Sequence, residues 1–213
     1  MNVYNVIILD ESGSMSSIYN ETLASINEVL GGIRKNQEEF LDQKHFVTIV
    51  TFEGSGMSGV RTRRDRVPVG TVAPFERKDY TPGGCTPLYD AMGKTLSELE
   101  GLVHPDDKVS VTVITDGMEN SSCEYSGKII KNMVSRLREK GWGVAYIGAN
   151  QDSVEVARSL NIGNALNFSA TSAGVEEMSH KLREANYRIC CCMDMGEDLG
   201  KFSRMFDDVE EDN

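Results

Sequence analysis

The sequence lacks any apolar run long enough to cross a membrane. A spanning helix needs about 20 consecutive, mostly apolar residues, and no stretch of this 213-residue chain approaches that length. The first short apolar run has no basic residues before it and ends at Asp10, whereas a signal peptide begins with a positively charged region. We therefore expect no membrane segment, no signal peptide and a cytoplasmic location.

Positive charge is also scarce. The chain has 22 lysine and arginine residues against 33 aspartate and glutamate residues, which gives a formal net charge of −11. Nucleic-acid binding depends on many basic contacts to phosphates, so this balance argues against a nucleic-acid partner. An acidic protein can still bind acidic groups if a bound cation reverses the local charge.

Cysteines are few, odd in number and without C-x-x-C spacing: Cys85, Cys123 and the run Cys190–Cys192. A disulfide framework normally uses an even set of cysteines in an extracellular protein. We therefore expect reduced thiols. The run of three lies at the end of a helical pattern, where adjacent side chains point in different directions, so we interpret it as ordinary packing.

What the sequence does contain is an alternation of strand and helix patterns. The strand patterns cover residues 3–9, 45–52, 59–69, 108–115, 143–147 and 165–168. Between most of them, apolar residues recur at helical spacing. We predict a Rossmann-like, doubly wound α/β fold: a mostly parallel six-stranded sheet with helices on both faces. The range 59–69 carries four arginines and is interpreted as an antiparallel edge strand protected by charge.

Local signals predict the ends of some elements. A serine at position 16 or 17 is expected to cap the first helix, and Gly141 to end the helix before the fifth strand. We predict one domain over residues 1–190 and a C-terminal extension over residues 191–213. The extension ends in the acidic stretch 205–213, which we expect to be solvated and flexible.

Three loops are candidates for a functional site, because ligands of open parallel sheets bind at the carboxyl ends of the strands. They cover residues 10–14, 81–87 and 116–120, and they contain two carboxylates and three hydroxyls: Asp10, Ser12, Ser14, Thr86 and Asp116. All are hard oxygen donors, which Mg²⁺ and Mn²⁺ prefer. Two carboxylates roughly balance a divalent ion, and neutral hydroxyls leave it able to bind one more acid.

This order, Asp10-x-Ser12-x-Ser14, then Thr86, then Asp116, resembles the metal-ion-dependent adhesion site of von Willebrand factor type A domains. The surrounding sequences VIILD, GGCTPLYDAMGKT and VITDGMENSS also match, and the tract that includes YIGANQDS is similar to small free-standing bacterial members. The resemblance reaches about residue 190. It therefore identifies the predicted domain as von Willebrand factor A-like.

The resemblance implies a protein-binding module that depends on a divalent cation, and not an enzyme. Ser12 and Ser14 would coordinate the metal directly, Thr86 directly when a ligand is bound, and Asp10 and Asp116 directly or through water. The expected metal is Mg²⁺, with Mn²⁺ or Ca²⁺ as alternatives. A glutamate or aspartate carboxylate from a partner protein would complete the coordination.

Residues beside these ligands carry further expectations. Glu11 departs from a frequent bacterial pattern, and its charge is expected to strengthen retention of the cation and to weaken attraction for an acidic partner. Glu119 and Asn120 follow Asp116. They are candidates for a rim that selects partners, although an ordinary solvated loop explains them as well.

Two alternatives use the same residues. A metal-dependent hydrolase or phosphatase-like enzyme could use Asp10 as a nucleophile, but such enzymes usually hold phosphate with a lysine, and the three loops contain none. A serine hydrolase needs a nearby base, yet His45, His104 and His180 lie outside the loops and no G-x-S-x-G occurs. No nucleotide-binding glycine motif is expected. In the second alternative, the protein is a structural subunit, and the cation only stabilises the arrangement of the three loops.

Overall fold

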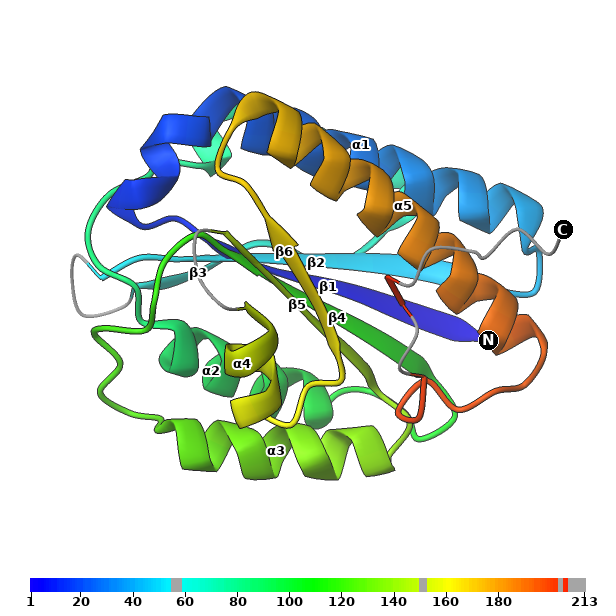
Figure 1. Cartoon of the computed structure of the whole chain (residues 1–213). Helices are drawn as coiled ribbons and strands as arrows, with labels where there is room; N and C mark the ends of the chain where they lie inside the picture. Colours follow the sequence, from blue (N-terminus) through cyan, green and yellow to red (C-terminus); the bar gives the residue numbers. More distant parts are fainter. Residues whose placement is uncertain (55–58, 150–152, 203–204, 207–213) are drawn as a thin grey trace, which may run out of the picture.

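The computed structural model describes residues 1–54, 59–149, 153–202 and 205–206. Within them, six strands form one sheet in the order β3-β2-β1-β4-β5-β6 (Figure 1). The strands are β1 (Asn2–Asp10), β2 (Lys44–Phe52), β3 (Val60–Pro68), β4 (Lys108–Thr115), β5 (Gly143–Ala149) and β6 (Asn164–Phe168). Neighbours are parallel except for the antiparallel pair β2 and β3. The predicted fold class is confirmed, including the antiparallel edge.

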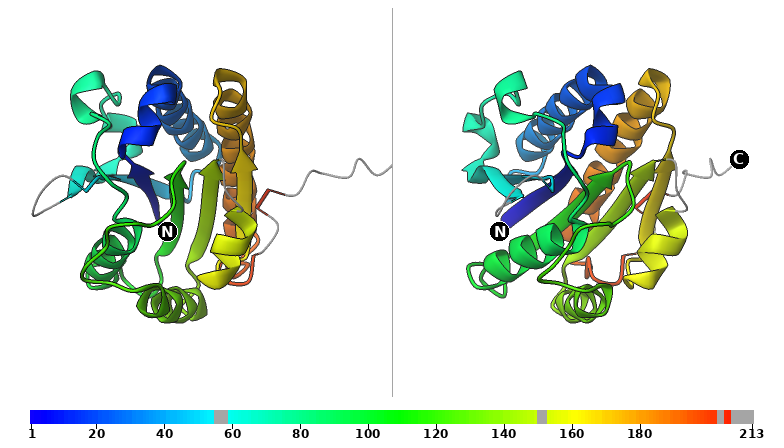
Figure 2. Two further views of the ribbon diagram at one scale, coloured as in Figure 1. Left: turned by 60° about the vertical axis from the view of Figure 1, so that its left-hand side comes forward. Right: turned by 90° about the vertical axis from the view of Figure 1, so that its left-hand side faces the viewer.

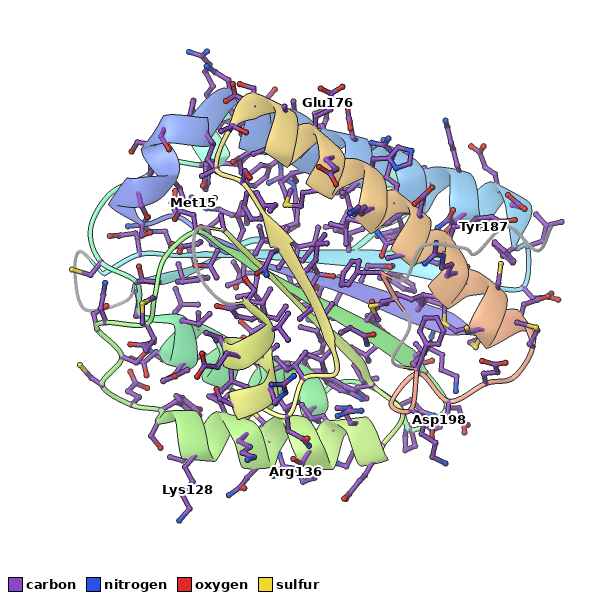
Figure 3. The ribbon with its side chains drawn as sticks, in the orientation of Figure 1. Met15, Lys128, Arg136, Glu176, Tyr187 and Asp198 are labelled. Carbon is purple, nitrogen blue, oxygen red and sulfur yellow. The ribbon has the colours of Figure 1, made fainter. Side chains whose placement is uncertain are left out.

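Helices cover both faces of the sheet (Figures 1 and 2). On one face lie α1 (Tyr19–Glu39) and α5 (Ser172–Asp194); on the other lie α2 (Leu88–Glu100), α3 (Gly127–Glu139) and α4 (Ser153–Ser159). Figure 3 shows Glu176 of α5 and Lys128 of α3 projecting from these opposite surfaces. Among the described residues, no helix has both the length and the apolar character needed to span a membrane.

Side-chain alternation along the strands divides the core between the two faces. In β1, Ile7 and Leu9 pack with α1 and α5, whereas Val6 and Ile8 pack with α2 and α3. Successive residues of a strand point to opposite faces, so a sheet covered by helices on both sides must be apolar at nearly every position. This explains why the central strands read as continuous apolar runs.

The first helix does not begin as predicted. Residues Gly13–Ile18 form a 3₁₀ helix, η1, and α1 starts after it, with Ile18 in the cap position. The predicted cap at Ser16 or Ser17 is therefore wrong, because these residues lie inside η1, where the Ser17 hydroxyl donates to the Ser14 carbonyl. Met15 of η1 is fully buried (Figure 3). The serine-rich segment folds as a compact turn over the end of β1.

The ends of the later helices are only partly as expected. Gly141 follows the cap of α3 with a φ of +83°, a left-handed conformation that glycine adopts at little cost. The last helix continues through residue 190 to Asp194. Beyond it, Leu199 and Met205 are buried against Val3 at the start of β1. Most of the predicted acidic tail, residues 207–213, lies outside the described residues.

The thiols near the end of α5 are consistent with simple packing. Cys190 and Cys192 are buried and free, and Cys191 is partly exposed. Cys190 and Cys192 belong to the same apolar cluster as Leu199 and Met205. Burial raises the pKa of Cys190 to about 12, because a thiolate is disfavoured away from water.

Strand order determines where a site can lie. β1 pairs with β2 on one side and with β4 on the other, and ligands of open α/β sheets bind where the strand order reverses in this way. Asp10 is the last residue of β1, and Asp116 directly follows β4. The two strands pair as far as Leu9 and Ile114. The sheet therefore delivers both predicted acidic ligands to one edge.

Candidate metal site

Hydrogen bonds connect the predicted ligands of the first and third loops. The Ser14 hydroxyl donates to Asp116 Oδ1 over 2.6 Å. Ser12 Oγ lies 3.1 Å from Ser14 Oγ, and the Ser12 backbone N–H donates to Asp10 Oδ1 over 2.7 Å. Residues that are more than a hundred positions apart in the sequence thus share one cluster of oxygens.

Gly117 shows that the second loop joins the same cluster. A methyl group placed on this glycine would lie 3.0 Å from Thr86 Oγ1 and 3.6 Å from both Asp10 Oδ2 and Ser14 Oγ. Three oxygens from the first and second loops therefore surround a point beside Gly117 of the third loop, and the missing side chain of Gly117 leaves that point open. The structure brings all five predicted ligands together.

Burial makes the two carboxylates costly to ionise. Asp10 is fully buried, and this burial raises the pKa of its carboxyl to about 6, although hydrogen bonds from Thr115 and Ser12 act in the opposite direction. Burial also raises the pKa of Asp116. A charged group loses hydration when it is buried. A cation held between the two carboxylates would offset that cost at neutral pH.

The donor set fits a small, hard divalent ion. It consists of two carboxylates and three hydroxyls, with no sulfur or imidazole, and oxygen ligands are those that Mg²⁺ and Mn²⁺ prefer. Among the described residues, no group of three or more His, Cys, Asp or Glu side chains is arranged to hold a metal. The hydroxyl-rich cluster at Asp10 is therefore the candidate.

Two residues that the sequence did not single out hold Asp10 in place. The Thr115 hydroxyl donates to Asp10 Oδ2 over 2.5 Å, and the Tyr80 hydroxyl donates to the Asp10 carbonyl over 2.8 Å. Both residues are fully buried. Thr115 could have been found from its place beside Asp116, whereas nothing in the local sequence links Tyr80 to a residue 70 positions away.

Asn120 and Glu119 hold neighbouring backbone segments of the site in place. Asn120 Oδ1 accepts from the Thr86 N–H over 2.9 Å, and the Asn120 N–H donates to the Thr86 carbonyl over 3.2 Å. Glu119 accepts from the Tyr89 N–H over 2.9 Å and from Ser122. These side chains fix Thr86 and the start of α2. Glu119 is partly exposed, and Asn120 and Met118 are exposed, so the partner-selecting rim stays a prediction.

Asp90 ties the same loop to α2. Its carboxylate accepts hydrogen bonds from the backbone N–H groups of Cys123, Glu124 and Tyr125 over 2.8 to 2.9 Å. Burial alone would raise the pKa of Asp90, but these three donors outweigh it, and the pKa lies below its usual value. The loop that carries Asp116 is therefore anchored at its far end as well.

We expect Asp90→Asn to lower the free energy of unfolding by about 2 kcal/mol. The amide nitrogen would replace one acceptor oxygen and leave a backbone N–H without a partner. Urea denaturation measures the change. The matched control is Asp106→Asn, because the Asp106 side chain is 91% exposed, and its substitution should leave stability nearly unchanged. Equal stability of the two variants would contradict the anchoring role of Asp90.

The four arginines of β3 form ion pairs. Arg61 and Arg63 pair with Glu11, Arg64 pairs with Asp79 and Arg66 pairs with Asp65. Each guanidinium therefore pairs with a carboxylate, while β3 lies at the edge of the sheet as predicted, and protection of that edge by charge stays a prediction. Arg61 and Arg63 offset the charge of Glu11, and its expected effects on cation retention and on an acidic partner stay predictions.

The expected absence of a nucleotide-binding glycine motif is wrong for the sequence itself. The residues Gly54, Gly56 and Gly59 match the letters G-x-G-x-x-G, which in dinucleotide-binding proteins form the turn between a strand and a helix. Here Gly54 follows β2 and Gly59 precedes the antiparallel strand β3, while Gly56 lies outside the described residues. The motif joins two strands, so it does not have the context of a nucleotide site.

Comparison with solved structures establishes a von Willebrand factor A-like Rossmann fold. A von Willebrand factor type A protein from Catenulispora acidiphila matches 87% of this chain and 43% of its own, with a TM-score of 0.53 and 15% identity. The pilus adhesin SpaC from Lactobacillus rhamnosus GG matches 87% and 30%, with a TM-score of 0.62 and 13% identity. Proximal thread matrix protein 1 from the mussel byssus matches 87% and 47%, with a TM-score of 0.56 and 16% identity.

At these identities the similarity concerns the fold alone. The chain spans less than half the length of each of these three structures. No protein-family model matches the sequence, and no curated protein matches it either.

Proposed function

We propose that the chain is a protein-binding module that depends on a divalent cation. In this proposal Asp10, Ser12, Ser14, Thr86 and Asp116 hold Mg²⁺, with Mn²⁺ or Ca²⁺ as alternatives, and a partner's glutamate or aspartate binds the same ion. The observation that carries the proposal is the convergence of Thr86, Asp10 and Ser14 oxygens around the point that Gly117 leaves open, with Ser12 and Asp116 both within hydrogen-bond distance of the Ser14 hydroxyl.

The charge of the donor set favours an acidic partner. Two carboxylates supply two negative charges, while the hydroxyls of Ser12, Ser14 and Thr86 are neutral. Bound there, the cation would supply a positive centre able to accept one more anionic oxygen. This resolves the apparent conflict between a net charge of −11 and a partner that is itself acidic. Similarity in fold to a pilus adhesin also supports a role in protein interaction.

The surroundings of the site support binding more than catalysis. No lysine occurs in the three loops, and the histidines have other environments. His45 is buried in contact with Asn5 and Gln43, while His104 and His180 are largely exposed. We therefore propose a non-enzymatic function. The free thiols support a proposed location in the reducing cytoplasm.

A binding experiment tests the proposal in two stages. Calorimetry with Mg²⁺ and Mn²⁺ alone should show one ion bound by the wild type and none by Asp10→Ala or Thr86→Ala. Pull-downs from the native lysate should then show partners that are captured with Mg²⁺, lost with EDTA and absent with either variant. The control is Ser135→Ala, which removes an α3 hydroxyl that donates to the Lys131 carbonyl and accepts from Asn161.

The outcomes separate the possible roles of the metal. Metal binding that raises the melting temperature without affecting capture would support a purely structural ion. Capture that survives both EDTA and Asp10→Ala would contradict the metal bridge. Because metal binding is measured first, a failure to find a partner is not confused with a failure to hold the ion.

A further inference from the structure

A third acidic residue, Glu11, lies between two of the proposed ligands, Asp10 and Ser12. Its side chain is fully buried, and a buried carboxylate is costly unless it is paired and hydrogen-bonded. Its backbone N–H donates to the Phe52 carbonyl at the end of β2 over 2.8 Å. Glu11 therefore continues the sheet at the point where the proposed metal loop begins.

Arg63 binds both oxygens of this carboxylate. Its Nη2 atom lies 3.0 Å from Glu11 Oε1 and 3.0 Å from Oε2, and its Nε atom donates to Thr51 Oγ1 of β2 over 2.9 Å. The guanidinium is thus fixed at two edges, a geometry that the point charge of a lysine does not reproduce. A second arginine is more distant: Arg61 Nη1 lies 3.5 Å from Glu11 Oε2, while Arg61 Nη2 lies 2.6 Å from Glu53 Oε1.

Glu11 also holds the loop that carries Thr86. Both the backbone N–H and the hydroxyl of Thr81 donate to Glu11 Oε1, and the Gly83 N–H donates to the Glu11 carbonyl over 2.9 Å. Next to it, the Gly13 N–H donates to the Gly84 carbonyl over 3.2 Å. The first and second loops are therefore joined mainly through one residue.

We propose that Glu11 is a positioning residue of the metal site and that Arg63 holds it in place. Glu11 sets the position of Thr86 relative to Asp10 and Ser14, while Arg63 fixes the Glu11 carboxylate and balances its charge. Residues that orient metal ligands without touching the metal commonly contribute about 10- to 100-fold to metal affinity. This inference rests on the proposed function, because it assumes that the site holds a cation.

Two substitutions separate position from charge. Glu11→Gln removes the charge and places an amide opposite Arg63, whereas Arg63→Lys keeps the positive charge and loses the two-edged contact. If Glu11 acts through position, both variants should raise the dissociation constant for Mn²⁺, Glu11→Gln by about tenfold and Arg63→Lys by less. If only charge matters, Arg63→Lys should bind Mn²⁺ as the wild type does, and the inference is overturned.

Arg64→Lys is the matched control on the same strand. Arg64 Nη2 lies 3.0 Å from Asp79 Oδ2. The hydrogen bonds of its guanidinium in the described part of the chain go to Asp79 and to the carbonyls of Arg63 and Pro74, outside the loop 10–14. We expect its substitution to leave the affinity for Mn²⁺ unchanged. A loss as large as that of Arg63→Lys would mean that β3 acts through general stability, which would overturn the inference.

Hydrogen exchange without metal gives a second, independent reading. In EDTA, the Thr81 amide should exchange faster in Glu11→Gln than in the wild type, because it donates to the Glu11 carboxylate. The Gly83 amide donates to the Glu11 backbone carbonyl, so it should also exchange faster if the loop as a whole loses its position. Unchanged exchange together with unchanged Mn²⁺ affinity would overturn the inference and leave the proposed function intact. A wild type that binds neither Mn²⁺ nor Mg²⁺ would overturn both.

Discussion

Replacing Asp10 by asparagine should make the metal-free protein more stable and remove its response to Mg²⁺. Asp10 is fully buried, and its pKa is raised to about 6 by that burial. At neutral pH the folded protein must therefore keep an unfavourable charge, at a cost of about 2–3 kcal/mol relative to the unfolded chain. Asparagine has the same shape and can still accept from the Ser12 N–H, which now bonds to Asp10 Oδ1.

The pH dependence has a defined sign. Because the folded pKa of Asp10 lies above the unfolded value of 3.8, its cost is present in full above about pH 6 and fades as the pH falls toward 4. The stability advantage of Asp10→Asn in EDTA should therefore shrink between neutral pH and about pH 5. With Mg²⁺ at about 100 times its dissociation constant, the wild type should gain about 2.7 kcal/mol, and the variant nothing.

Urea denaturation with EDTA and with Mg²⁺, at each pH, measures both effects. Asp106→Asn removes one carboxylate at an exposed position and should show neither of them. The cation site would be contradicted by an Asp10→Asn variant that still gains stability from Mg²⁺. A variant that is less stable than the wild type in EDTA would show instead that the Asp10 hydrogen bonds outweigh its buried charge.

Gly117→Ala should abolish most of the metal affinity without unfolding the protein. The added methyl group would lie 3.0 Å from Thr86 Oγ1 and would face Asp10 and Ser14. Gly117 does not have a positive φ, so alanine fits its backbone, and Thr86 has to give way by only a few tenths of an ångström. We expect the dissociation constant for Mg²⁺ to rise by about tenfold or more, as when ligand orientation is disturbed.

Calorimetry gives the affinity, and urea denaturation in EDTA gives the stability. The control is Gly31→Ala in α1, where an added methyl group meets nothing within 4 Å. That variant should gain about 0.5–1 kcal/mol through helix propensity and bind Mg²⁺ like the wild type. Normal Mg²⁺ binding by Gly117→Ala would place the ion elsewhere, and the proposed ligand set would have to be revised.

The fold and the meeting of the three loops could be predicted because they follow from local patterns. The β-branched residues of β4 predict a strand. Because neighbouring strands are parallel, their carboxyl ends lie at one edge of the sheet. Asp10 and Asp116 stand at those ends, so their proximity followed from the strand assignment. The pairing of β1 with β4 was not predicted, because alternation of strands and helices does not by itself fix the order of the strands.

The supporting contacts could not be predicted because they have no local pattern. Glu11 and Arg63 are 52 residues apart, and arginines at alternate positions of an edge strand look the same whether they repel other chains or bind a buried carboxylate. Asp90 likewise receives its donors from a loop more than 30 residues away. The start of α1 was misassigned because serines that cap helices also form 3₁₀ turns.

The course of α5 has a practical consequence for anyone shortening this chain. A fragment that stops at residue 190 would cut through the helix, because α5 runs to Asp194. It would also strip Leu199 and Met205 from the beginning of β1 and leave Val3, which is now fully covered, in water. Recombinant fragments should therefore extend at least to residue 206, so that the amino end of the central strand keeps its apolar cover.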